Sequence, residues 1–202
     1  MRKISCSLFS LMSVMSLLAL AGCRQQQAEA PPPPPEPPYM VVASIRQIMG
    51  ALIDPSADAV WDSVKYTATP KGMVETIPRT DEDWLVARNG ALRVIEGANL
   101  LLTPGRHVGG PNDKSAVPGI ELEPVEIDAS IAKERRAWEN YVKALQNVNL
   151  EALKAVEAKD TQKLYEVGSQ MEDACEQCHT HFWYPNQGIP GLPSPAPAPA
   201  TK

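Results

Sequence analysis

The sequence lacks several features that would indicate common classes of protein. Basic residues are not in excess: 19 lysines and arginines stand against 24 aspartates and glutamates in 202 residues, which argues against a nucleic-acid partner. The longest mostly apolar stretch, residues 8–20, is too short to favour a membrane-spanning helix. No segment has a convincing alternation of apolar and polar residues that would predict a β-strand. These absences favour an acidic domain built from helices.

Cysteine is scarce as well, and the four that are present have distinct settings. Cys6 and Cys23 flank the N-terminal apolar stretch, whereas Cys175 and Cys178 stand near the other end of the chain, followed by His179. These last three residues form the C-x-x-C-H pattern that attaches a c-type haem. In a helix they fall at i, i+3 and i+4, so both thiols and the imidazole leave one face. One macrocycle can then be bonded at its edge and ligated at its centre.

Two other chemistries use a C-x-x-C pair. A closed zinc site needs four ligands, and only His107 and His181 remain as candidates because there is no second C-x-x-C. A thioredoxin-like dithiol expects a preceding strand in a βαβ context, which this sequence does not suggest. Both remain alternatives to haem, with less support.

The N-terminus has the pattern of an export signal. Arg2 and Lys3 precede the apolar stretch, and Leu20-Ala21-Gly22-Cys23 follows, which resembles the lipobox of bacterial lipoproteins. The resemblance implies a signal peptide over residues 1–22, lipidation of Cys23 and a periplasmic protein anchored to a bacterial membrane. After cleavage 17 basic and 24 acidic residues remain, a net charge of −7, and no cysteine is left for a disulfide. A plain signal peptide and an uncleaved anchor are the alternatives.

Proline-rich segments bracket the rest of the chain. Residues 23–38 comprise Cys23 and a linker that is almost all proline at its end, which predicts an extended spacer. Residues 187–202 are rich in proline and alanine and are predicted to be disordered. The folded domain is therefore expected over residues 39–186.

Apolar residues in this domain recur at spacings of three and four. A first helix is predicted from the stripe Val41, Val42, Ile45, Ile48, Met49 and Leu52. It should break or kink near Asp54-Pro55, where Asp54 would cap a new start. A second helix would begin at Thr80 with an approximate capping box and end near Pro104. A Gly- and Pro-rich loop over residues 105–124 would follow.

Two further helices are predicted in the C-terminal half. The third spans about residues 128–159, with a break near residues 147–149, and the fourth begins after Asp160 or Thr161 and ends before Pro185. Four amphipathic helices predict an all-α fold, an antiparallel four-helix bundle holding a covalently attached haem c.

One C-x-x-C-H motif on the last of four helices resembles the class II c-type cytochromes, the family of cytochrome c prime and its low-spin relatives. The resemblance implies a haem packed between helices, with His179 as the proximal iron ligand. In low-spin members a methionine from the first helix is the sixth ligand. In cytochrome c prime that position is apolar and the iron is five-coordinate.

Met49 is the best candidate for such a sixth ligand. Met171 shares a helix with His179, Met73 lies in a Pro- and Gly-containing loop, and Met40 stands at the frayed start of the first helix. Met49 could instead be an adaptable core residue, the usual role of a helical methionine. Arg46, three residues before Met49, is a candidate for pairing with a haem propionate, although such arginines are more often solvated.

The expected function is outer-sphere electron transfer through a His/Met-ligated haem, without enzymatic activity, to a periplasmic or membrane redox partner. The alternative is a five-coordinate haem that binds or senses a small gas such as NO or CO. A peroxidase is disfavoured because no distal acid-base pair is evident. Apolar stripes on the first two helices would also suit a homodimer.

Overall fold

The computed structural model describes residues 38–185 and 187. The chain divides into two units, Met1–Tyr39 and Met40–Lys202, and the fold described below is that of the second. Its elements in chain order are α2 (Ile45–Ile48), the π-helical turn η1 (Met49–Ile53), α3 (Asp54–Trp61), β1 (Lys65–Thr69), β2 (Gly72–Thr76), α4 (Asp81–Leu101), α5 (Pro124–Lys133), α6 (Arg135–Glu157) and α7 (Thr161–Phe182).

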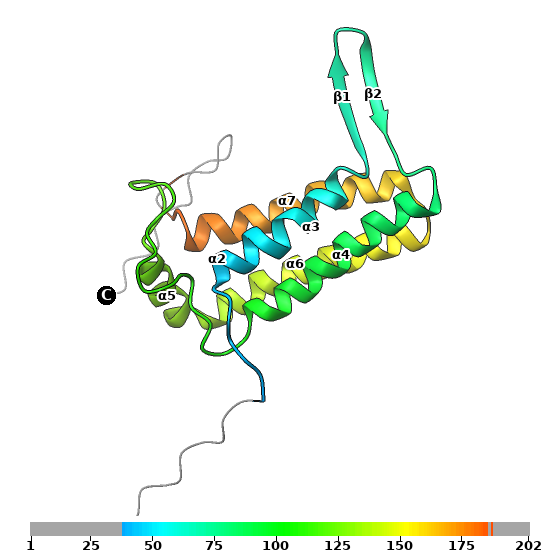
Figure 1. Cartoon of the computed structure of the whole chain (residues 1–202). Coiled ribbons are helices and arrows are strands. Elements are labelled where there is room, and N and C mark those ends of the chain that lie inside the picture. Colours follow the sequence, from blue (N-terminus) through cyan, green and yellow to red (C-terminus); the bar gives the residue numbers. More distant parts are fainter. Residues whose placement is uncertain (1–37, 186, 188–202) are drawn as a thin grey trace, which may run out of the picture. The chain divides into compact units, whose positions relative to one another are not determined.

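The predicted all-α four-helix bundle is wrong. The described residues are mostly helical, but they include a two-stranded antiparallel sheet in which Lys65 pairs with Thr76 and Thr69 with Gly72. Figure 1 shows this hairpin extending away from the helices. Both of its faces are largely exposed, so its sequence carries no apolar alternation that could have revealed it. Apart from residues 38 and 187, the two proline-rich segments that flank this domain lie outside the described residues.

The first helix changes at Asp54, where a π-helical turn ends and α3 begins, but Asp54 is not the predicted cap. The backbone of Asp54 is helical and its side chain caps nothing; its N–H instead bonds to the oxygen of Met49, five residues back. Pro55 has no N–H to donate and stands in the first turn of α3, as predicted, but α3 follows the π-helical turn directly and no side chain caps it. Helices α2 and α3 are therefore joined through η1, and Met49 is the first residue of that turn.

Two helix starts are as predicted. Thr80 forms a capping box with Asp83: Thr80 Oγ1 accepts from the Asp83 N–H at 3.1 Å, and Asp83 Oδ2 accepts from the Thr80 N–H at 2.9 Å. Asp160 caps α7 by accepting from the Lys163 N–H at 2.9 Å. The break predicted near residue 148 is wrong, because α6 is continuous there and the chain turns instead at Glu134, between α5 and α6.

Helix α6 packs against both α4 and α7, and α3 packs against α4 (Figure 1). The close approach of α3 and α4 depends on Gly90, where an added Cβ would lie 2.7 Å from the main-chain oxygen of Ser56. About two turns further along α4, an added Cβ at Gly97 would lie 2.7 Å from a side-chain carbon of Ile53. Small residues on α4 thus bring the segment that carries Met49 close to the core.

Candidate functional site

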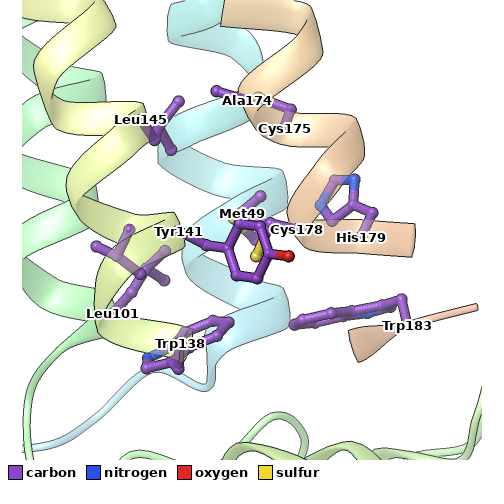
Figure 2. Close-up of a pocket in the computed structure, with 11 residues that line it drawn as sticks. Met49, Leu101, Trp138, Tyr141, Leu145, Ala174, Cys175, Cys178, His179 and Trp183 are labelled. Carbon is purple, nitrogen blue, oxygen red and sulfur yellow. The ribbon is translucent and has the colours of Figure 1, made fainter. Parts of the chain in front are cut away.

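The C-x-x-C-H motif lies in the last turns of α7, helical as expected. Cys175 and Cys178 are free thiols and both are half-buried, as is His179. All three line one cavity, whose surroundings are drawn in Figure 2. The helix therefore presents two thiols and one imidazole toward the same space.

The wall of this cavity is almost entirely apolar and comes from four helical segments. Its lining residues are Met49, Leu101, Trp138, Tyr141, Val142, Leu145, Ala174, Cys175, Cys178, His179 and Trp183. The enclosed volume is about 20 Å³, room for about one water molecule, so these side chains would have to part to admit a haem. An apolar wall with a few converging donor atoms is typical of cofactor sites.

A second, more open cavity of about 220 Å³ adjoins the first and shares Met49, His179 and Trp183 with it. Polar groups are concentrated here: Arg46, Asp54, Glu121 and Tyr184 complete the lining together with Gly50. Burial raises the pKa of the Asp54 carboxyl, an effect that the nearby His179 opposes. The site thus has an apolar interior and a polar outer side.

Burial also governs the ionisation of the motif. It raises the pKa of the Cys175 thiol to about 11, with Asp54 adding to the effect, and that of Cys178 to about 12. The pKa of His179 is lowered, mainly by burial, although Glu176 and Asp54 oppose the shift. The neutral imidazole favoured here is the form that ligates a metal.

The structure places Met49 at this site. Its half-buried side chain lines both cavities, the first of them together with Cys178. Of the other methionines within the described residues, Met40 and Met73 are exposed and Met171 is fully buried in the core. Ligation of iron by Met49 stays a prediction, but Met49 is the methionine that shares a cavity with His179.

Arg46 borders the second cavity, as its spacing from Met49 suggested. Its Nη1 already donates to the main-chain oxygen of Lys114 at 2.5 Å. A propionate contact would therefore use the remaining donors of the guanidinium.

The two other histidines lie against carboxylates. His107 Nδ1 is 3.1 Å from Asp128 Oδ2, and His181 Nε2 is 3.1 Å from Glu134 Oε2. Neither histidine lines either cavity. Within residues 38–185 and 187, no three histidine, cysteine or acidic side chains lie close enough together to hold a metal ion. The zinc alternative gains no support from this arrangement.

Sequence reasoning missed several residues of the site. Trp138, Tyr141, Val142 and Leu145 share one face of α6, and their spacing could have placed them together on a cofactor wall. The rings of Trp138 and Trp183 are stacked, with their centroids 6.3 Å apart. Glu121 had no such signal, because it comes from the long loop between α4 and α5 and only the folded chain brings it to His179.

A hydrogen bond joins the motif to Tyr184, which follows α7. Tyr184 Oη donates to Glu176 Oε2 at 2.7 Å, and this hydrogen bond follows burial among the causes that raise the pKa of Tyr184. The bond ties the end of α7 to the residue directly after Cys175.

The predicted signal peptide, the predicted lipidation site Cys23 and most of the proline linker lie outside the described residues. In the part of the chain that the structure describes, none of the helices combines the length and the apolar character needed to cross a membrane. In comparisons with protein-family models, curated proteins and solved structures, nothing matches this chain.

Proposed function

We propose that this chain is an exported c-type cytochrome that carries electrons. The observation that supports this most strongly is that Cys175, Cys178 and His179 line one apolar cavity, with Met49 entering it from another helical segment. Two thiols and one histidine are the groups that attach haem c and ligate its iron, and a methionine on a separate helical segment can supply the sixth ligand of a low-spin haem. The motif lies on the last helix, α7, which is the position that the resemblance to class II cytochromes implies.

A covalently bound haem would supply a one-electron iron couple. The chain's own residues would hold and tune it: Cys175 and Cys178 by thioether bonds, His179 through its neutral imidazole, and Met49 through its thioether. A methionine ligand favours the ferrous state and raises the reduction potential. Trp138 and Leu145 keep water from the interior, which supports rapid electron transfer with no exchange of ligands.

The ferric absorption spectrum of the purified holoprotein tests Met49. We expect a low-spin spectrum with a methionine-to-iron charge-transfer band, and loss of this band in Met49→Ala. Met73→Ala is the matched control, because Met73 is two-thirds exposed on the β-hairpin and lines neither cavity. An unchanged spectrum in Met49→Ala would remove Met49 from the site.

A five-coordinate haem that binds a small gas is the second candidate. It is favoured by one observation, the apolar lining around Met49, in which Leu101, Val142 and Leu145 offer no ligand to iron. A high-spin ferric spectrum with ready carbon monoxide binding to the ferrous form would support this candidate against the carrier.

We further propose that the protein is anchored to a bacterial membrane in the periplasm through lipid on Cys23. The proline-rich linker would then separate the domain from the bilayer. The net negative charge favours a redox partner with a basic docking surface. Cys23→Ser should release the protein from membranes while its haem content is unchanged; a variant that stays membrane-bound contradicts lipid anchoring.

A further inference from the structure

The helix that carries Met49 is held in place by a short segment of the loop between α4 and α5. Ile45 N–H donates to the main-chain oxygen of His107 at 2.9 Å, and Arg46 N–H to that of Val108 at 3.1 Å. These two amides belong to the first turn of α2, where a helix has no internal partners for its N–H groups. The loop thus completes the start of the helix, four residues before Met49.

Two side chains fix this segment from opposite sides. Arg106 donates through Nε to the oxygen of Leu100 at 2.8 Å and through Nη1 to the oxygen of Ala43, so it joins the end of α4 to the residue before the α2 cap. Asp128 of α5 accepts from the Val108 N–H at 2.9 Å and faces His107 Nδ1.

The burial of the Val108 side chain strengthens the attachment of residues 106–108 to α2. The Val108 side chain is fully buried in the core, so the loop cannot slide along α2 without removing it from there. Beyond α2 the chain enters the π-helical turn at Met49, whose bonding pattern is less regular than that of an α-helix. The place of Met49 in the cavity therefore depends on the anchored first turn.

We propose that Arg106 and Asp128 are positioning residues that hold α2 against residues 106–108 and thereby place the Met49 thioether in the cavity shared with His179. The iron-related part of this role rests on the proposed function. The part of the proposal that concerns α2 does not rest on the proposed function, because the hydrogen bonds of the Ile45 and Arg46 amides can be measured directly.

The test uses the full-length holoprotein with two readouts, amide hydrogen exchange at Ile45 and Arg46 and the methionine-to-iron band. In Arg106→Ala and Asp128→Ala we expect exchange at both amides to be at least about fivefold faster, as for the loss of one hydrogen bond, and the band to weaken. Asp128→Asn keeps an acceptor for Val108 N–H and should restore most of both readouts.

Arg135→Ala is the matched control. Arg135 also donates to the end of α4, through Nη2 to the oxygen of Leu102 at 3.0 Å, but it does not contact α2. It should lower stability without changing either readout. The positioning role is overturned if the amides of Ile45 and Arg46 exchange no faster in Arg106→Ala than in Arg135→Ala. It is also overturned if Arg106→Ala keeps the full methionine-to-iron band.

Met49→Ala separates this proposal from the proposed function. If its spectrum equals that of the wild type, ligation by Met49 fails, and the exchange rates at Ile45 and Arg46 still decide whether Arg106 and Asp128 hold α2. Should Asp128→Ala not fold, Arg106→Ala and Asp128→Asn carry the test alone.

Discussion

Trp61 donates a hydrogen bond of 2.9 Å from its indole Nε1 to the main-chain oxygen of Gly168. The bond joins α3, which continues the segment of Met49, to α7, which carries the C-x-x-C-H motif. The glycine on α7 allows a close approach here, because an added Cβ at Gly168 would lie 3.2 Å from Trp61 Cδ1, tighter than an ordinary contact. The two halves of the candidate site are thus linked by a specific contact outside it.

Replacing this indole tests the link. Trp61→Phe keeps most of the ring but removes the donor, and we expect the free energy of unfolding to fall by about 0.5–1.5 kcal/mol, the usual value for one hydrogen bond. Urea denaturation measures the change. A variant as stable as the wild type would show that the bond contributes nothing to holding α3 against α7.

The close approach of α3 and α4 gives a second prediction. Alanine is favoured over glycine in helices by about 1 kcal/mol, yet Gly90→Ala should destabilise the protein, because its Cβ meets the main-chain oxygen of Ser56. Overpacking of this kind typically costs about 1–3 kcal/mol.

Arg88→Ala provides the control for Gly90→Ala, since Arg88 is exposed on the same helix and its replacement should change stability by no more than about 0.5 kcal/mol. Thermal or urea unfolding of both variants gives the comparison. Stabilisation by Gly90→Ala would mean that α3 can move away from α4 at no cost.

The capping box of α4 predicts that the stability of the fold decreases at acid pH. Hydrogen bonds from the backbone N–H groups of Arg79 and Thr80 lower the pKa of Asp83. A carboxyl whose pKa is lower in the folded state stabilises the fold above its unfolded pKa of about 3.9, and this contribution is lost as the pH falls through the folded value.

Comparison with Asp83→Asn isolates that contribution. The wild type should be more stable than the variant at pH 7, and the difference should shrink as the pH is lowered toward 3. Urea midpoints across this range measure it. A difference that is constant with pH would exclude ionised Asp83 as the source.

The sequence predicted those parts of the fold that depend on local chemistry. The caps at Thr80 and Asp160 were found because their side chains act on the nearest N–H groups. The β-hairpin was missed because neither of its faces is buried, and the π-turn because Pro55 was interpreted as a helix start.

The candidate site was predictable to a similar extent. Cys175, Cys178 and His179 follow from a spacing that one helical turn fixes. Met49 was singled out because the resemblance to class II cytochromes implies a methionine on the first helix. Glu121, Arg106 and Asp128 were not predictable, because a long loop and a separate helix bring them to α2 and α7 only in the folded chain.

Mass spectrometry of the holoprotein, produced in a bacterium that attaches haem c in its periplasm, tests the central claim most directly. After denaturation and proteolysis, the peptide containing residues 175–179 should carry one covalently bound haem, and a Cys175→Ser, Cys178→Ser double variant should carry none. Recovery of that peptide from the wild type with two unmodified thiols would contradict the proposed cytochrome.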